Sequence, residues 1–338
     1  MAAEEVVSSA RLSALAREAG FDLVGFARAE PIPKSVLTDW LAAGFAADMD
    51  WLGARLEDRL DVRRLLPDAR TVVALACNHW RTDEPSLIAR YARGRDYHAT
   101  LRDRLRTLRR TFRQTWPGAQ DYGSVDATPV MEKVWAARAG LGYVGRHGLL
   151  ITPEHGSWVL LAAFIIDREV DAYAGGPTAD RCAGCKLCVN ACPTDAIVAD
   201  QTVDAGKCLS YQTIENVGVV PEPFRLAMAE TVFGCDICQV VCPHNAAPLP
   251  GGERFAPRPV AGLDARALAA MTAEQYAQWI PGTALARAQY DGLRRNAIYA
   301  LGAQQDLGAR ALLQRLASDG SAAVREAAQW ALGRLESP

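Results

Sequence analysis

The stretch RCAGCKLCVNACPTDAI, residues 181–197, spaces four cysteines as C-x₂-C-x₂-C-x₃-C and places a proline after the last one. In bacterial ferredoxins, a run of this form gives three thiolates to one [4Fe–4S] cluster, and its fourth cysteine binds a second cluster. The spacing therefore predicts two clusters, whose remaining ligands must lie downstream.

Those ligands are present in split form. Cys208 stands alone in GKCLS, and FGCDICQVVCPHN supplies three more cysteines before a proline. Under the crossed ferredoxin pattern, each cluster takes ligands from both runs. The predicted sets are Cys182, Cys185, Cys188 and Cys242 for the first cluster, and Cys192, Cys208, Cys235 and Cys238 for the second.

Structural zinc and disulfide bonds are the alternatives for so many cysteines. Zinc sites favour paired C-x₂-C knuckles over three thiolates within seven residues. The ninth cysteine, Cys77, lies in TVVALACNHW, a run typical of a buried strand with a free thiol. In an oxidising compartment these cysteines would more often form disulfides, so we expect a reducing, cytoplasmic location.

Two features argue against a membrane protein. The N-terminal stretch is acidic and lacks both a basic n-region and a twin arginine. The longest apolar run, WVLLAAFII at 158–166, is too short to cross a bilayer. We therefore expect no membrane partner.

The 338 residues suffice for two or three domains. Helical patterns at 9–19, 35–43, 98–115 and 129–139 alternate with the apolar strands DLVGFA, TVVALAC and WVLLAAFIID, which predicts an α/β or α+β region. Pro/Gly breaks near 171–181 and 251 divide the chain into predicted domains 1–172, 173–252 and 253–338.

The third segment contains an internal repeat. LRRNAIYALG at 293–302 and VREAAQWALG at 324–333 match at an interval of 31 residues. This period is typical of HEAT-like helix pairs, whose surfaces more often bind partners than catalyse reactions. We expect its removal to spare the cofactors.

Arginines are concentrated between residues 81 and 113, where the sequence has ten arginines and only four acidic residues. The segment LRDRLRTLRRTF places Leu101, Leu105, Leu108 and Phe112 on one helical stripe and arginines on the other faces. The arginines form either an ordinary solvated face or a phosphate-binding surface. The net charge of −2 does not decide between these interpretations.

The segment 126–145 combines a helix with a misleading glycine motif. GLGYVG at 140–145 fits the dinucleotide-binding spacing but follows a helix, so we expect Gly140 at the helix C-terminus and no Rossmann site. Thr128 and Pro129 predict the helix start, as N-cap and first residue. Asp126 then lies outside the helix, where a lone aspartate is usually a turn residue.

The motifs YARGRDYH, VDATPVMEKVWAARAGLGYVGRHG, CLSYQTIE and GCDICQVVCPHN, together with the split cysteine set and the HEAT-like helices, closely resemble the epoxyqueuosine reductase family. Its members reduce epoxyqueuosine to queuosine at the wobble position of tRNAs with GUN anticodons. The resemblance covers nearly the whole chain. It implies a cobalamin-binding catalytic domain, a ferredoxin-like domain with two [4Fe–4S] clusters that pass electrons to cobalamin, and a tRNA-contacting helical domain.

The resemblance also assigns site residues. Asp126 is implied as the acid that protonates the departing epoxide oxygen, with a pKa raised by burial against the corrin. The implied cobalamin contacts are Arg59, Arg90, Asp126, Met131, Glu132, Lys133, Gly145, Gly148 and Leu149. DYHATL has Leu101 where a histidine-ligand motif needs glycine, so we expect cobalt to have no protein histidine ligand.

The implied tRNA contacts are Ser210 and Thr213, which are otherwise ordinary hydroxyls at a helix start. At position 216 some members carry lysine or another polar residue, whereas this chain has Asn216. We expect a monomer that receives electrons from a flavodoxin or ferredoxin.

Two other functions compete with this interpretation. A reductive dehalogenase acting on a small molecule would use the same cofactors, but it typically carries a twin-arginine signal and needs neither the arginine-rich helix nor the repeat. A plain electron-transfer ferredoxin would need only residues 180–245.

Overall fold

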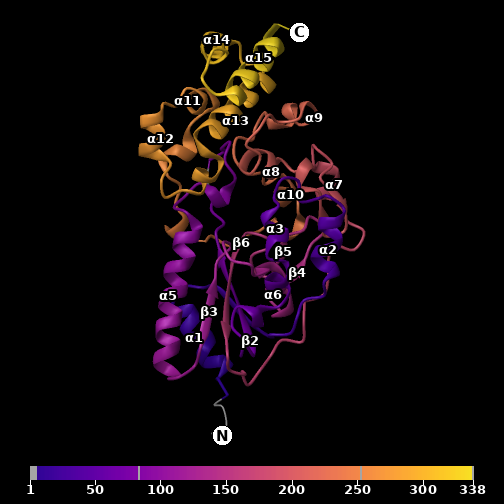
Figure 1. Ribbon diagram of the computed structural model, residues 1–338, viewed down its shortest axis with the longest axis vertical. Coiled ribbons are helices and arrows are strands. Elements are labelled where there is room, and N and C mark those ends of the chain that lie inside the picture. Colours follow the sequence, from indigo (N-terminus) through magenta and orange to yellow (C-terminus); the bar gives the residue numbers. More distant parts are fainter. Residues whose placement is uncertain (1–5, 83, 252, 337–338) are drawn as a thin grey trace.

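The computed structural model describes residues 6–82, 84–251 and 253–336. The sheet region lies at one end of the long axis and the C-terminal helices at the other. Much of the cysteine-bearing segment, residues 173–252, lies between them (Figure 1). The predicted domains 1–172 and 253–338 each include terminal residues that lie outside the described part.

An antiparallel four-stranded sheet, in the order β1-β2-β6-β3, forms the N-terminal region. Its strands are β1 (Leu23–Arg28), β2 (Thr71–Asn78), β6 (Val159–Ile166) and β3 (Asp121–Ser124). Every residue of β2 is buried because this strand is paired on both edges and covered on both faces. The antiparallel pairing makes the region α+β.

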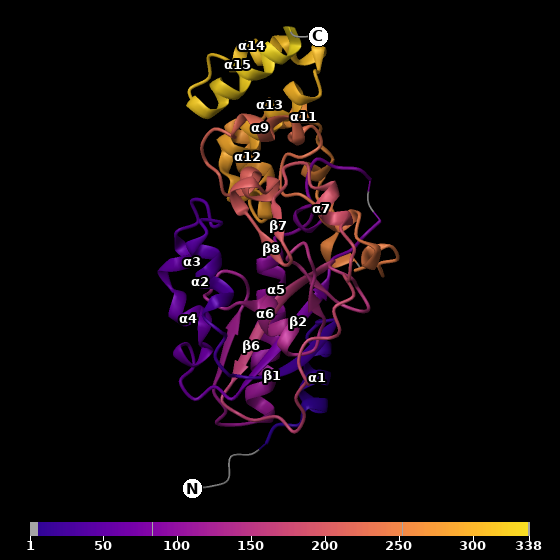
Figure 2. The same ribbon diagram turned by 90° about the vertical axis from the view of Figure 1, so that its right-hand side faces the viewer.

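Helices cover the two faces of the sheet. The helices of this region are α1 (Ser9–Glu18), α2 (Ser35–Ala42), α3 (Trp51–Ala54), α4 (Leu56–Leu60), α5 (Tyr97–Thr115) and α6 (Glu132–Arg138). Apolar residues of α1 and α5 pack with Val73 and Phe164, whereas α2, α4 and α6 pack with Val72 and Ile165. Figure 2 shows α2, α3 and α4 on the opposite side of the sheet from α1.

The first three predicted helices are confirmed to within one residue at each end, but the predicted start at Pro129 is wrong. Helix α6 begins at Glu132, and Met131 occupies the N-cap. The Thr128 hydroxyl instead shares a hydrogen bond with the Ser124 hydroxyl. Glu132 accepts hydrogen bonds from Ser124 and from the Asp126 backbone, which holds residues 126–131 in a bend before the helix.

Short elements hold the cysteine-bearing segment. They are β4 (Tyr143–Val144), β5 (Leu150–Ile151), α7 (Leu187–Ala191), β7 (Ile197–Ala199), β8 (Thr202–Val203), α8 (Leu209–Ile214), α9 (Glu222–Arg225) and α10 (Ile237–Val240). Helices α7 and α10 each follow the start of a cysteine run, and they contact each other. The two runs therefore lie side by side.

The C-terminal region is helical, as the repeat predicts. Its helices are α11 (Ala265–Ala269), α12 (Ala273–Trp279), α13 (Gln289–Ala303), α14 (Arg310–Leu316) and α15 (Ala322–Glu336). The two copies of the repeat lie in α13 and α15, which pack together. Single 3₁₀ turns occur at Val62–Arg64, Arg90–Ala92, Ala205–Lys207, Leu226–Met228, Pro243–Asn245, Glu253–Phe255, Pro259–Gly262, Ala284–Ala288 and Leu307–Ala309.

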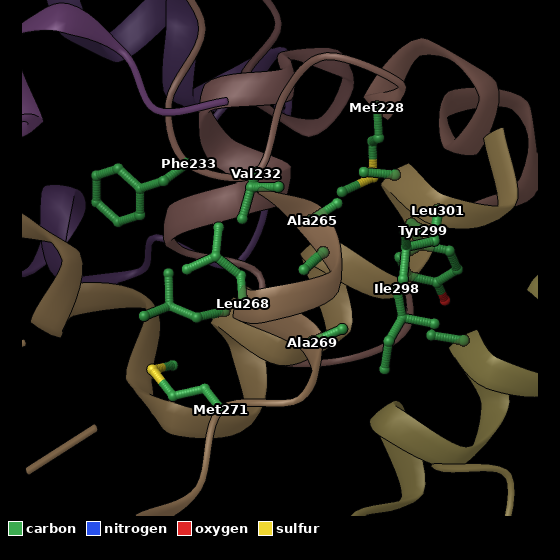
Figure 3. Packing of buried hydrophobic residues seen from close by; sticks show 14 of the residues in the cluster. Met228, Val232, Phe233, Ala265, Leu268, Ala269, Met271, Ile298, Tyr299 and Leu301 are labelled. Atoms are coloured by element: carbon green, nitrogen blue, oxygen red, sulfur yellow. The ribbon is translucent and has the colours of Figure 1, made fainter. Parts of the chain in front are cut away.

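One hydrophobic core joins the C-terminal helices to the cysteine-bearing segment. Met228, Val232 and Phe233 pack in the same cluster as Leu268 and Ile298 (Figure 3). Removing the helices would expose these side chains to water at a cost of about 25 cal/mol per Å². The expectation that removal spares the cofactors is therefore not supported by the packing.

Across the described part of the chain, no helix has both the length and the apolar character needed to span a membrane.

Candidate functional site

Asp126 lies in the bend between β3 and α6, with a backbone φ of +54°. Aspartate tolerates this left-handed conformation better than most residues, but it still adopts it rarely. The hydrogen bond from its backbone N–H to Glu132 Oε1, at 3.0 Å, helps to hold it there. Its side chain is 60% exposed, so the carboxylate is accessible from outside the protein.

Two neighbours at the start of α5 bind the carboxylate of Asp126. The Tyr97 hydroxyl donates to Oδ2 at 2.6 Å, and His98 Nε2 lies 2.9 Å from the same oxygen. His98 Nδ1 lies 2.8 Å from Asp96 Oδ1. Since both ring nitrogens face carboxylate oxygens, both act as donors when the ring is the charged imidazolium.

The electrostatics of Asp96, His98 and Asp126 favour the imidazolium form of His98. Burial lowers the pKa of His98, but the hydrogen bonds to Asp126 and Asp96 outweigh it and raise the pKa to about 9. The hydrogen bond from His98 is also the largest influence on Asp126, whose pKa lies below its usual value although partial desolvation of the carboxyl by surrounding protein atoms opposes this. In this structure the hydrogen bonds from His98 and Tyr97 stabilise the ionised form of Asp126. The raised pKa expected from burial against a corrin stays a prediction.

Glu132 and Arg59 are close to this carboxylate. Glu132 also accepts a hydrogen bond from Ser124 Oγ at 2.6 Å, and burial raises its pKa to about 7. Burial lowers the pKa of Arg59, while the charges of Glu132 and Asp126 oppose that shift. The Arg59 guanidinium lies 5.4 Å from the centre of the Trp51 ring and donates to the Leu52 carbonyl.

The glycine-rich loop after α6 lies beside the same helix. Lys133 Nζ donates to the Gly148 carbonyl, which ties α6 to the loop. A Cβ at Gly145 would lie 2.4 Å from Ile151, and one at Gly148 would lie 3.2 Å from Val203. A side chain at Gly145 would therefore need the end of the Ile151 side chain to move, and Gly148 has a φ of +78°, which favours glycine. Gly140, with φ of +75°, follows α6 as the predicted C-terminal glycine.

The structure thus gathers part of the predicted cofactor-binding set. Arg59, Asp126 and Glu132 interact directly or through their charges, and Met131 precedes Glu132 at the N-cap position of α6. Lys133 is hydrogen-bonded to the loop that contains Gly145, Gly148 and Leu149.

Arg90 is directed elsewhere. Its guanidinium lies 4.2 Å from the Trp80 ring centre and donates to the Arg81 carbonyl, while its backbone N–H donates to Asp236. No contact found in the described residues joins its side chain to the Asp126 site.

The two hydroxyls predicted to contact tRNA differ in accessibility. Thr213 is fully buried, and its hydroxyl donates to the Leu209 carbonyl and accepts from the Gly234 N–H. This conformation therefore does not support a direct tRNA contact by the Thr213 side chain, because both hydrogen bonds point into the protein. Ser210 is partly exposed on the same helix.

None of the nine cysteines, all of which lie in the described part of the chain, forms a disulfide. Most neighbours that shift their pKa values belong to the same predicted set, although Cys188 of the first set also raises the pKa of Cys238 in the second. Burial and then the charges of Cys182, Cys188 and Cys185 raise the pKa of Cys242. Burial raises the pKa of Cys235 to about 12, with contributions from Cys208 and Cys192.

Backbone N–H groups also point at the sulfurs. Arg146 N lies 3.4 Å from Cys182 Sγ, and Ala196 N lies 3.4 Å from Cys192 Sγ. Such contacts are among the features that tune an iron–sulfur cluster. In the described ranges, no three His, Cys, Asp or Glu side chains form a group that could hold a single metal ion. The thiol sets fit clusters through their spacing, grouping and N–H···S contacts.

Sequence reasoning did not assign a role to His98 or Asp96. The signal is present in DYH, which also begins the incomplete cobalt-ligand motif DYHATL. An Asp-x-His sequence at a helix start could have indicated a charged histidine, because Asp96 also caps α5 by accepting the His98 N–H.

Three family models match the chain. They describe the epoxyqueuosine reductase QueG, DUF1730, over residues 59–127, a 4Fe-4S double cluster binding domain over 181–245, and HEAT repeats over 282–338.

Curated relatives and solved structures agree with these models. Epoxyqueuosine reductase of Gloeobacter violaceus is 39% identical over 90% of this chain and 99% of its own length, and that of Vibrio cholerae is 35% identical over 84% and 80%. An epoxyqueuosine reductase crystallised with an epoxyqueuosine-modified tRNA-Tyr stem loop superimposes with a TM-score of 0.90, at 28% identity over 97% of this chain and 90% of that one. The enzyme from Streptococcus thermophilus gives a TM-score of 0.89 at 26% identity, with the same coverage. This chain therefore belongs to the epoxyqueuosine reductase family.

Proposed function

We propose that this protein reduces epoxyqueuosine to queuosine at the wobble position of tRNA, using two [4Fe–4S] clusters and cobalamin. Family membership supports the reaction, and the observation that carries the chemistry is the exposed Asp126 carboxylate, with His98 Nε2 at 2.9 Å from its Oδ2. The reaction breaks both C–O bonds of the epoxide, forms a C=C bond and releases water. It consumes two electrons and two protons.

The residues around Asp126 fit the cofactor. Cobalamin combines an apolar corrin with amide side chains and a phosphate. Met131 and Leu149 offer apolar contacts, while Arg59, Glu132 and Lys133 offer charged groups beside them. When bound, cobalamin supplies a reducible metal centre that receives single electrons and acts on carbon. Arg90 would contribute only if its side chain left Trp80.

His98 and Asp126 act together as the acid. Asp126 is ionised near neutral pH and so has no proton of its own to give. The proton that it delivers must come from a charged neighbour. The imidazolium of His98 passes its Nε2 proton to Asp126, which delivers it to the departing oxygen, while the Nδ1–H stays on the ring and donates to Asp96. The exposed carboxylate then takes the second proton from solvent.

The arginines of α5 provide a phosphate-binding surface. Arg106, Arg109, Arg110 and Arg113 line a hollow of about 430 Å³. A second hollow, of about 370 Å³, runs from Arg102 towards Thr128 in the Asp126 loop. These neighbouring hollows suit an RNA backbone approaching the site.

Not all these arginines are equally available. Asp121, whose side chain is fully buried, pairs with both Arg109 and Arg113. Within the described residues, Arg102 and Arg110 form no ion pair, so we assign the phosphate contacts chiefly to them. Ser210 is a further candidate contact. We also propose a monomeric, cytoplasmic protein that receives electrons from a flavodoxin or ferredoxin.

The function is tested with anaerobically reconstituted protein, a strong chemical reductant and tRNA that carries epoxyqueuosine. Nucleoside analysis should show queuosine only when cobalamin is present. The matched control omits cobalamin but keeps the clusters. Failure to convert this tRNA, combined with reductive loss of halide from a haloaromatic compound, would favour the dehalogenase alternative.

A further inference from the structure

A buried arginine of the C-terminal helices reaches into the cysteine-bearing segment. Arg295 of α13 is 0% exposed. Its Nη1 donates to the carbonyls of Asn216, at 2.7 Å, and Gly218, and its Nη2 donates to the Gln212 carbonyl at 3.0 Å. These carbonyls lie at the end of α8 and in the turn that follows it. Cys208 occupies the N-cap of the same helix.

The next residue of α13 connects two cysteine-bearing segments. Asn296, also 0% exposed, donates to the Thr213 carbonyl and to the Val232 carbonyl, both at 2.8 Å. The Thr213 hydroxyl accepts the Gly234 N–H at 2.9 Å. Through Asn296, helix α8 and the irregular segment that leads into Cys235 are held by the same side chain.

This arrangement is not the simplest way to stabilise a helical repeat. A buried guanidinium without a carboxylate partner is costly, and burial lowers the pKa of Arg295 to about 10. The last carbonyls of a helix lack intrahelical donors and carry the negative end of its dipole, so a buried cation satisfies both needs there. The cost is thus offset at the end of α8, outside the C-terminal helices.

We infer that Arg295 and Asn296 are positioning residues for the second cluster, since they fix the backbone segments that present Cys208 and Cys235. The C-terminal helices then support electron transfer directly, in addition to any contact with tRNA. This inference goes beyond the proposed function, because it concerns cluster geometry and would hold for any substrate. Solvent access and hydrogen bonding around the sulfurs set a cluster's reduction potential, so looser segments should change it.

The test compares Arg295→Met with Arg294→Met. Arg294 is the adjacent residue of α13 and is also buried, but its hydrogen bonds go to Asp319 and the Ala269 carbonyl, both within the C-terminal region. Iron and sulfide contents are determined directly, and the two midpoint potentials are measured by EPR-monitored redox titration. Both measurements are made without tRNA or cobalamin. Only Arg295→Met should shift the potential or lower the occupancy of one cluster.

Equal potentials and equal iron content in both variants would overturn the inference. If Arg295→Met does not fold, Thr213→Val replaces it, because valine keeps the shape but cannot accept the Gly234 N–H. This variant should shift one midpoint potential and leave the other unchanged. Two unchanged potentials in Thr213→Val would equally overturn the inference. Since neither readout uses tRNA, a failure here is distinct from a failure of the proposed function.

Discussion

The charged groups around Asp126 and those around Arg295 occupy opposite environments. Asp126 lies on an exposed bend in an uncommon backbone conformation and is held by a histidine cation. Arg295 is fully buried in a regular helix, and its hydrogen-bond partners among the described residues are neutral oxygen acceptors. An exposed charge can meet a substrate and exchange protons, whereas a buried one can only fix its surroundings. The first region is therefore suited to chemistry and the second to holding a cofactor.

The largest effect should come from changing a cysteine that binds a cluster in the region around Arg295. Cys208→Ala should lower the iron content from about eight to about four per chain and abolish queuosine formation, because one cluster loses a thiolate. Cys77→Ala, which changes the free thiol in β2, is the control and should keep both clusters. The comparison of the two regions would be broken if Cys208→Ala also prevented binding of the tRNA stem loop.

A change at the exposed site should affect the chemical step alone. Asp126→Asn removes the carboxylate that relays the proton, so single-turnover formation of queuosine should slow by about 10²- to 10⁴-fold. The iron content and both cluster potentials should stay at the parent values. Thr128→Val, in the same loop, is the control. A nearly parental rate in Asp126→Asn would mean that the proton reaches the oxygen without this residue.

The His98 cation predicts a pH dependence that the buried region should lack. The folded-state pKa of about 9 lies above the ordinary value of 6.5. The raised pKa means that the charged ring stabilises the fold fully below pH 6.5, and that this contribution is lost as the pH rises through about 9.

In the parent protein, turnover should therefore fall as the pH rises through about 9. His98→Gln should remove this fall and slow the reaction by about 10²-fold at neutral pH. Rates measured from pH 6 to 10 give the profile, and Tyr97→Phe, which keeps the ring but loses its hydroxyl, should retain the pH dependence. An unchanged profile in His98→Gln would assign the titration to another group.

The smallest effect concerns the path of the RNA towards the exposed site. Arg110→Ala should reduce the slope of log affinity against log salt by about 1, because one phosphate contact no longer releases a counterion. Arg63→Ala is the matched control, since Arg63 is paired with Asp61. Stem-loop binding at several salt concentrations provides the measurement. Identical slopes in both variants would make α5 an ordinary solvated face.

Local sequence patterns predicted most of the framework. Strands β1, β2 and β6 and helices α1, α2 and α5 follow from apolar runs and helical spacing, which depend on near neighbours. The repeat predicted the paired helices α13 and α15. Strand β3 was not predicted, because DYGS is short and has no apolar alternation, and it is a strand only through its pairing with β6.

Spacing along the chain determined the kind of cofactor ligand, since cysteines a few residues apart necessarily present their thiolates together. The protonation of Asp126, the burial of Thr213 and the role of Arg295 depended on partners far along the chain. His98 lies 28 residues from Asp126, and Asn296 lies 83 residues from Thr213. A pKa and a side chain's exposure are set by the groups that surround it in space, and only the tertiary structure brings those groups together.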